Sequence, residues 1–183
     1  MRHAPVDPPG YLYGSTDADI EKVSSQISKS IYARLSDCQA FYCSPALRCI
    51  KTYQAVFPER PLPFKIHEFW EQDFGDWESL PYEEIPDHGN ISGKNLVQFS
   101  PPNGESFAEL CQRTQPLLLK IISERKVGEI AIFTHAGVIR SFLALALGSK
   151  EVALKFSVDN LSISGIQALP DGQFYISFVN QTC

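Results

Sequence analysis

EIAIFTHAGVIRSFLALALG, residues 129–148 of this 183-residue chain, joins two patterns that together decide the fold class. Its first seven residues are mostly apolar and β-branched, which predicts a buried β-strand ending at His135. Gly137 then leads into the apolar run VIRSFLALALG, which predicts a helix. A strand that passes directly into a helix is typical of parallel sheet units, so an α/β protein is predicted.

A second strand-to-helix unit lies upstream. QAFYC (39–43) predicts a short buried strand, and the next residues predict a helix with Ser44 at the N-cap and Pro45 at the first helical position. Arg48 then falls in or near the first turn of that helix. FKIHEF (64–69) predicts a further strand, which leads into an acidic and aromatic segment.

Two more helices and a hairpin complete the predicted elements. Thr16 is predicted to cap a helix whose apolar residues recur at helical spacing, namely Ile20, Val23, Ile27 and Ile31. A long helix is predicted from Glu105, kinked or split at Pro116. LSISGIQAL and QFYISFV, joined by Pro170, Asp171 and Gly172, predict a β-hairpin.

These elements predict a three-layer α/β/α sandwich with a mostly parallel mixed sheet. The length is that of one domain, which we place over residues 1–183. Prolines and glycines dominate residues 80–102, which are predicted to form an irregular insertion near the active site. Substrate selectivity could lie in this insertion.

Composition excludes several classes of partner. The net charge is −5 and no run of Lys or Arg occurs, which argues against nucleic acid or an anionic membrane. The five cysteines contain no CxxC pair, so neither a disulfide framework nor a zinc site is indicated, and no cofactor is predicted. The start lacks an apolar signal core and the longest apolar stretch is too short to cross a bilayer, so we expect a cytoplasmic protein, either a monomer or a homodimer.

Two residues mark a predicted anion site. Arg48 and His135 each lie just beyond the carboxyl end of a predicted strand, where open α/β sheets bind ligands and helix N-termini offer N–H groups. A phosphate monoester suits the planar guanidinium groups of Arg48 and Arg2. No glycine-rich phosphate loop, cysteine phosphatase loop or aspartate-rich metal cluster is present, so other common solutions to phosphate chemistry are not supported.

Five motifs in order carry a resemblance to a known family. They are Arg2-His3-Ala4, SPALRCIKT (44–52), EQDFGDWE (71–78), NGESF (103–107) and THAGVIR (134–140). The chain thereby resembles branch 1 of the histidine phosphatase superfamily, also called phosphoglycerate mutase-like. Within that superfamily, YLYGSTD (11–17), FGDWE and the compact length are most similar to the α-ribazole phosphatases of cobalamin synthesis.

The resemblance implies a reaction and a site. It implies a metal-independent phosphomonoester hydrolase that works through a phosphohistidine intermediate, with α-ribazole 5′-phosphate as candidate substrate. His3 would be the nucleophile, Glu71 the general acid, and Arg2, Arg48 and His135 the ligands of the phosphoryl oxygens. The implied substrate-binding residues are Tyr13, Gly14, Ser15 and Ala136.

Other polar and aromatic residues of the motifs receive structural interpretations. Asp73, Asp76 and Glu78 are interpreted as solvated loop charges, and Glu105 as serving either a helix N-terminus or a ligand. Trp70, Trp77, Tyr11 and Tyr13 could stack on a flat base, but packing of the loop is favoured. His67 and His88 are assigned to packing or to the surface.

The sequence departs from the family pattern near its start. Members usually carry an apolar strand ahead of the Arg-His pair, whereas here Met1 immediately precedes it, so a central strand is expected to be missing from the given sequence. Ala4 replaces the usual glycine, which is tolerable unless that backbone needs a positive φ, and Pro9 replaces a common asparagine. Two alternatives stay open: a phosphoglycerate mutase-type transferase, and a non-catalytic phosphate-binding domain of the same fold.

Overall fold

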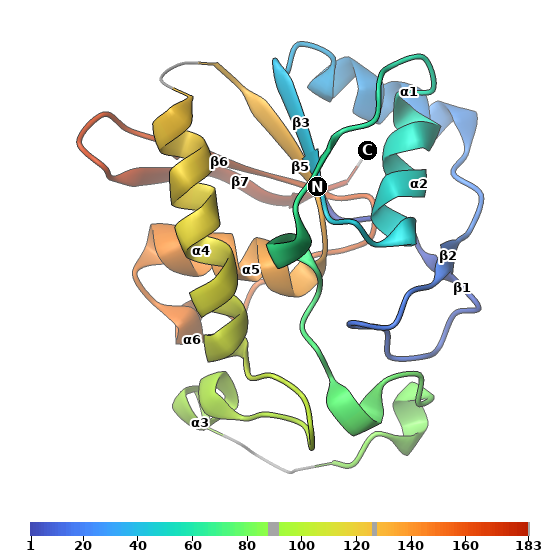
Figure 1. Cartoon of the computed structure of the whole chain (residues 1–183), viewed down its shortest axis with the longest axis vertical. Coiled ribbons are helices and arrows are strands. Elements are labelled where there is room, and N and C mark those ends of the chain that lie inside the picture. Colours follow the sequence, from blue (N-terminus) through green and yellow to red (C-terminus); the bar gives the residue numbers. More distant parts are fainter. Residues whose placement is uncertain (88–91, 126–127, 183) are drawn as a thin grey trace.

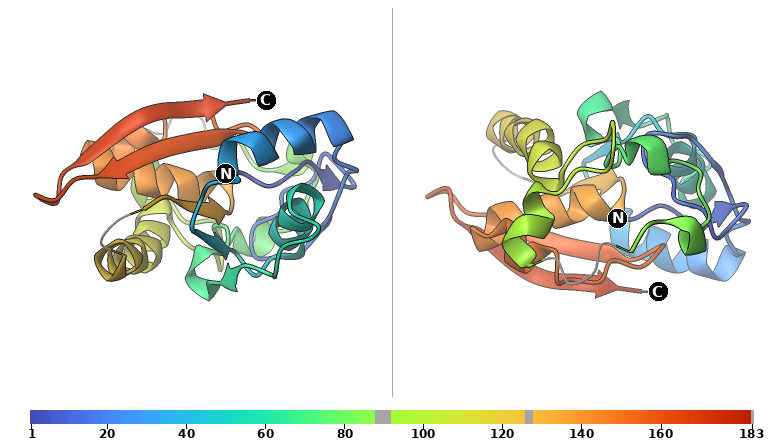
Figure 2. Two further views of the ribbon diagram at one scale, coloured as in Figure 1. Left: turned by 90° about the horizontal axis from the view of Figure 1, so that it is seen from above. Right: turned by 90° about the horizontal axis from the view of Figure 1, so that it is seen from below.

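A computed structural model describes residues 1–87, 92–125 and 128–182, and its strands form three small sheets (Figure 1). The central sheet has the order β4-β3-β5, all parallel, from Phe64–Lys65, Ala40–Cys43 and Ile130–Phe133. The antiparallel hairpin of β6 (Ile163–Ala168) and β7 (Phe174–Gln181) runs along one side of the molecule (Figure 2). The third sheet is a short antiparallel ladder of β1 (Val6–Asp7) and β2 (Asp19–Ile20).

Helices cover both faces of the parallel sheet. The α-helices are α1 (Ser25–Leu35), α2 (Leu47–Val56), α3 (Gly93–Gln98), α4 (Phe107–Glu124), α5 (Ala136–Leu147) and α6 (Lys150–Ala153). Alternate strand residues enter two separate cores: Phe41 and Phe133 pack with α1 and α2, whereas Tyr42 and Ile132 pack with α4 and α5. The three-layer α/β/α architecture is therefore confirmed. Within the described ranges, no helix is both long and apolar enough to cross a membrane.

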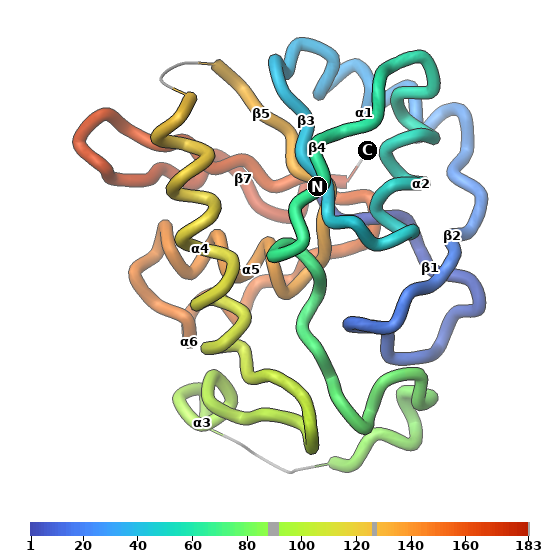
Figure 3. Tube along the Cα trace, viewed as in Figure 1, coloured from blue at the N-terminus to red at the C-terminus, as the bar shows by residue number. Residues whose placement is uncertain are grey.

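The N-terminal residues lie in the middle of the molecule, between the two larger sheets (Figure 3). Arg2 pairs in parallel with Thr134 beyond the end of β5, and its N–H donates to the Ser162 carbonyl at 3.0 Å. The Leu161 N–H in turn donates to the His3 carbonyl at 3.2 Å. Residues 1–3 thus connect the end of β5 to the chain just before the hairpin.

Two predicted helix starts are wrong. The first helix begins at Ser25, not after Thr16, because Ser24 caps it through a hydrogen bond from the Ile27 N–H. The residues between form β2 and irregular chain. The helix after β3 begins at Leu47 with Ala46 at the N-cap, so Ser44 and Pro45 lie outside it.

Other elements differ in extent. FKIHEF forms only the two-residue strand β4, followed by a 3₁₀ turn at His67–Phe69. Helix α4 is continuous through Pro116 rather than split, since its buried face packs along its whole length. The predicted hairpin is confirmed, with Gly172 at a φ of 84° in the turn. The insertion contains 3₁₀ turn Tyr82–Glu84 and α3, while His88 lies outside the described residues.

Candidate active site

Two strand-to-helix junctions meet at one edge of the parallel sheet. β3 leads into α2, which carries Arg48, and β5 leads into α5, with His135 at its N-cap. The junctions lie side by side because Cys43 pairs with Phe133. The His3 N–H donates to the Thr134 carbonyl at 3.0 Å, which sets the centroids of the His3 and His135 rings 5.2 Å apart.

The His3 ring has a defined tautomer. Its Nδ1 lies 2.7 Å from the Ala4 carbonyl, which only accepts, so Nδ1 carries the proton and Nε2 keeps its lone pair. Burial, followed by the charges of Arg48 and Arg2, lowers the pKa of His3 to about 3. Ala4 does not have a positive φ, so alanine is tolerated at this position, where the family usually has glycine.

The His135 ring has the opposite tautomer. Arg48 Nε donates to its Nδ1 at 3.2 Å, so Nε2 carries the proton and lies 2.8 Å from Ser44 Oγ. Burial, then the charges of Arg48 and His3, lower the pKa of His135 well below its usual value. Sequence reasoning missed this role of Ser44 because a serine before a helix is ordinarily a cap.

Arg48 is fully buried and holds a loop as well as a histidine. Its Nη1 donates to the Thr16 carbonyl at 2.9 Å and its Nη2 to the Gly14 carbonyl at 2.6 Å. The carboxylate of Asp17 lies 3.6 Å from Nη1. The guanidinium thus ties the loop of residues 14–17 to the site.

Glu78 anchors the same loop and is not the solvated charge predicted from the sequence. Its half-buried carboxylate accepts the N–H groups of Gly14 at 3.0 Å, Ser15 at 2.8 Å, Thr16 at 3.0 Å and Phe74 at 3.0 Å. Burial by itself would raise the pKa of Glu78, but these hydrogen bonds outweigh burial and lower the pKa. Asp73 and Asp76 also have partners, the Gly75 N–H and the Asn103 side chain.

Arg2 carries a donor without a protein partner. Its Nη1 donates to the Val158 carbonyl at 2.6 Å, whereas its buried Nε has no hydrogen-bond partner among the described residues. Burial lowers the pKa of Arg2, although the nearby carboxylate of Glu71 and the phenol of Tyr82 raise it. A buried, unsatisfied cationic donor is costly unless a ligand completes it, and an anion has the required chemistry.

Glu71 lies on irregular chain between two 3₁₀ turns and reaches the N-terminus of α5. Its two carboxylate oxygens lie 3.1 and 3.2 Å from the Gly137 N–H, and only 8% of the residue is exposed. A Cβ at residue 137 would lie 2.4 Å from Glu71 Oε1, so a side chain there would displace the Glu71 carboxylate from the position it holds. Helix N-termini attract negative charge, and this carboxylate lies at the end of α5 that carries His135 at its N-cap.

The four predicted substrate-binding residues do not gather at one point. Gly14 presents its carbonyl to Arg48 and to Trp70 Nε1, while Ala136 is the first residue of α5. The Ser15 hydroxyl donates to Asp73 Oδ1 at 3.2 Å on the exposed side of the loop. Tyr13 stands farther out, with its ring 6.3 Å from that of Tyr11.

The remaining aromatics divide between packing and the lining of a separate cleft. Trp70 is held by its hydrogen bond to Gly14, and Trp77 stacks on Phe99, as the packing interpretation predicts. Tyr11 and Tyr82 instead border a cleft of about 460 Å³, completed by Pro9, Gly10, Pro81 and Glu83. His67 is exposed, as expected.

The fold and the geometry define an α/β protein in which two histidines, two arginines and one carboxylate lie around the ends of β3 and β5. The family pattern of the histidine phosphatase superfamily (branch 1) matches residues 1–182, and the chain belongs to that superfamily. A bifunctional protein of Mycobacterium tuberculosis (strain ATCC 25618 / H37Rv) is 29% identical over 157 residues, 82% of this chain and 43% of that protein. The chain spans less than half the length of the curated relatives it matches.

Solved structures share the fold. The α-ribazole phosphatase from Shigella flexneri has a TM-score of 0.80 at 24% identity, covering 99% of this chain and 94% of that one. A phosphoserine phosphatase from Entamoeba histolytica in complex with 3-phosphoglyceric acid has a TM-score of 0.82 at 22% identity, covering 99% and 94%. At these identities, the likeness concerns the fold.

Proposed function

We propose that this chain hydrolyses phosphomonoesters, passing the phosphoryl group first to His3 and then to water. The observation that carries the proposal is the state of the His3 ring. Its Nδ1–H is held by the Ala4 carbonyl and Nε2 keeps its lone pair, while a pKa of about 3 keeps the ring neutral at pH 7. Family membership supports the same assignment.

The first step forms a bond from His3 Nε2 to phosphorus as the bond to the leaving oxygen breaks in line. Glu71 in its protonated form gives a proton to that oxygen. Arg2, whose Nε has no protein partner, and Arg48 stabilise the equatorial oxygens. Since Arg48 already donates to the loop carbonyls of Gly14 and Thr16, the phosphate shares these donors with the loop or displaces it.

The second step returns the nucleophile. The carboxylate of Glu71 accepts a proton from water while the water oxygen bonds to phosphorus. The phosphorus–nitrogen bond breaks, and its electron pair goes back to Nε2. Throughout, the hydrogen bond from Nδ1–H to the Ala4 carbonyl stabilises the positive charge of the phosphorylated ring.

The proposed substrate is α-ribazole 5′-phosphate, an ester with a flat aromatic base. The cleft of about 460 Å³ is lined in part by Tyr11 and Tyr82, and aromatic residues suit a planar leaving group; the proposal takes this cleft as the place of the base. Glu83 on the same cleft disfavours a leaving group with a second negative charge. The structural likeness to α-ribazole phosphatases is consistent with this choice at the level of the fold.

Phosphate release measured with chelator present tests both the phosphohistidine mechanism and the proposed substrate. The esters are α-ribazole 5′-phosphate, phosphoserine and p-nitrophenyl phosphate, and the proteins are wild type, His3→Gln and the control His67→Gln on an exposed histidine. We expect His3→Gln to lose at least about 10³-fold in kcat, and denaturation of wild type during turnover with SDS at alkaline pH to trap a base-stable, acid-labile phosphohistidine. His67→Gln should behave as wild type.

Other results would select the other hypotheses. Turnover that persists in His3→Gln would remove His3 as nucleophile. Phosphate binding without turnover of any ester would identify a binding domain, and phosphoryl transfer between phosphoglycerates in preference to water would identify a mutase. Equal activity on all three esters would leave the phosphatase standing but reject the aromatic substrate.

A further inference from the structure

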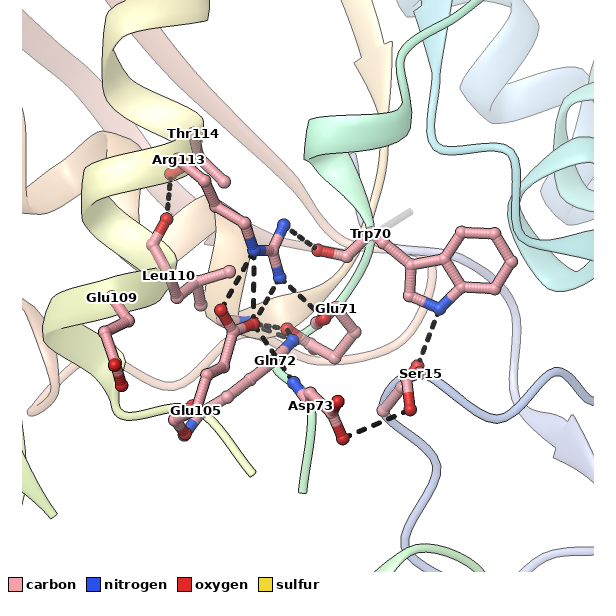
Figure 4. A network of polar contacts seen from close by, with 12 residues as sticks. Ser15, Trp70, Glu71, Gln72, Asp73, Glu105, Glu109, Leu110, Arg113 and Thr114 are labelled. Carbon is pink, nitrogen blue, oxygen red and sulfur yellow. Dashed lines mark hydrogen bonds and ion pairs between the residues drawn. The ribbon is translucent and has the colours of Figure 1, made fainter. Parts of the chain in front are cut away.

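Arg113, on helix α4, contacts the segment that carries Glu71 at several points (Figure 4). Its Nη1 donates to the Glu68 carbonyl at 2.5 Å and to the Trp70 carbonyl at 2.9 Å. Its Nη2 donates to the carbonyl of Glu71 itself at 2.8 Å. One guanidinium therefore binds three backbone carbonyls within four consecutive residues.

These bonds replace the backbone ladder that the segment lacks. Glu68 and Phe69 end the 3₁₀ turn His67–Phe69, and Trp70 and Glu71 follow it in irregular chain, so their carbonyls need partners from elsewhere. The one remaining carbonyl of the four, that of Phe69, accepts the Thr134 hydroxyl at 3.0 Å. Every carbonyl from Glu68 to Glu71 is thus held by a side chain that comes from another element.

Glu105 holds the guanidinium of Arg113 in place. Its carboxylate accepts Arg113 Nε at 3.0 Å and also pairs with Nη2. The same carboxylate accepts the Asp73 N–H at 3.1 Å, and the Glu105 carbonyl accepts Gln72 Nε2 at 2.8 Å. Glu105 therefore neither caps α4, a role taken by the Ser106 and Glu109 capping box, nor reaches the phosphate site.

The two ends of Glu71 are fixed by two helices that pack together. Its carbonyl is bound by Arg113 of α4, and its carboxylate by the Gly137 N–H of α5. Next to Arg113, the Thr114 hydroxyl bonds to the Ser141 hydroxyl of α5 at 2.5 Å. The position of α4 relative to α5 therefore sets the position of the carboxylate.

We propose that Arg113, locked by Glu105, is the positioning residue of the general acid. It touches no reacting atom, and it acts by fixing the backbone from which the Glu71 carboxylate projects toward the leaving oxygen. The inference rests on the proposed function, because it takes Glu71 as the acid. Lysine cannot replace Arg113, since one ammonium cannot reach three carbonyls and a carboxylate in the planar geometry of the guanidinium.

The dependence of the rate on the leaving group shows whether Arg113 positions Glu71 or only stabilises the fold. A p-nitrophenolate leaves with little help, whereas an alkoxide needs the proton that Glu71 supplies. We expect Arg113→Lys to lower kcat/KM, which reports the first phosphoryl transfer and not the later hydrolysis that Glu71 also serves, by about 10²-fold on a simple alkyl phosphate and by less than about 3-fold on p-nitrophenyl phosphate. Glu71→Gln should show the same selectivity, and the double variant should be no worse than Glu71→Gln alone because both act on one group.

The control and the second variant keep the test decisive. Arg125→Lys alters an arginine just after α4 that bonds to Tyr42 Oη, and its leaving-group dependence should be that of wild type. If Arg113→Lys does not fold, Glu105→Gln serves in its place, because it keeps the carbonyl contacts of Arg113 but loses the ion pair. It should also lose more activity on the alkyl phosphate than on p-nitrophenyl phosphate, by a smaller factor than Arg113→Lys. Equal losses on both esters, or losses that add to those of Glu71→Gln, would overturn the positioning role. No selectivity in Glu71→Gln itself would instead remove Glu71 as the acid.

Discussion

The site has two walls that are held in place by different means. The regular wall, formed by His3, Arg48 and His135, stands on strand and helix ends, and its register is set by backbone pairing such as Arg2 with Thr134. The irregular wall, residues 68–78 with Glu71, is held by side chains bound to its backbone. Substitutions of its own functional side chains should lower the activity that depends on the regular wall. The irregular wall should also be sensitive to substitutions of residues elsewhere in the chain that hold its backbone.

The largest effect is expected on the regular wall, from Arg48→Lys. The variant keeps a charge but loses the fork that contacts Gly14, Thr16 and His135 together. We expect kcat/KM for any good ester to fall by about 10³-fold. Steady-state kinetics check this, and Lys51→Ala, one turn along α2 in an exposed ion pair with Asp19, should change kcat/KM by less than about 2-fold. A small effect of Arg48→Lys would break the contrast between the walls.

The second effect concerns Glu78, a residue of the irregular wall whose carboxylate anchors the loop of residues 14–17. Glu78→Gln leaves a single acceptor oxygen for four backbone N–H groups, so we expect a loss of about 2 kcal/mol in the free energy of unfolding. Urea denaturation measures it. The matched control, Asp76→Asn on the same segment, bonds only an exposed Asn103 side chain and should cost less than about 0.5 kcal/mol. Equal costs for the two variants would show that Glu78 is no special anchor.

The sequence predicts the regular wall far better than the irregular one. Apolar runs and glycine at residue 137 reveal the βα units, and parallel pairing then brings Arg48 and His135 together. The motif resemblance adds His3 and Glu71. No local pattern reveals Arg113, which is one arginine on an amphipathic helix, eight residues after its partner Glu105.

The failures of prediction have the same origin. Thr16 resembles a helix cap locally, but its N–H is bound by Glu78, 62 residues along the chain, and Ser24 caps the helix instead. Ser44 likewise resembles a cap, and its hydroxyl bonds to His135, 91 residues away. Long-range side-chain bonds to backbone or ring atoms leave no periodic signal in the sequence, whereas apolar burial does.

A third effect tests the neutral histidines of the regular wall through pH. Below pH 6.5 the unfolded chain binds a proton at His3, while the folded chain does not until about pH 3. Stability therefore rises with pH across this window and is lost as pH falls, by about 1.4 kcal/mol per pH unit for one histidine. Urea unfolding at several pH values between 6.5 and 5 gives the change in the free energy of unfolding per pH unit. This change should be smaller in His3→Gln than in wild type by about that amount. An unchanged slope in His3→Gln would contradict the lowered pKa of His3.

The smallest effect concerns the cleft lined by Tyr11 and Tyr82, which belongs to neither wall. Tyr82 borders the cleft and is 58% exposed, so its removal should leave the fold and the chemistry unchanged. We expect Tyr82→Ala to raise KM for α-ribazole 5′-phosphate about 5-fold, the value of one aromatic contact, and to leave KM for glycerol phosphate unchanged. Tyr175→Ala, an exposed tyrosine on β7, is the matched control. An equal change for both esters would mean that Tyr82 does not act by contact with the base.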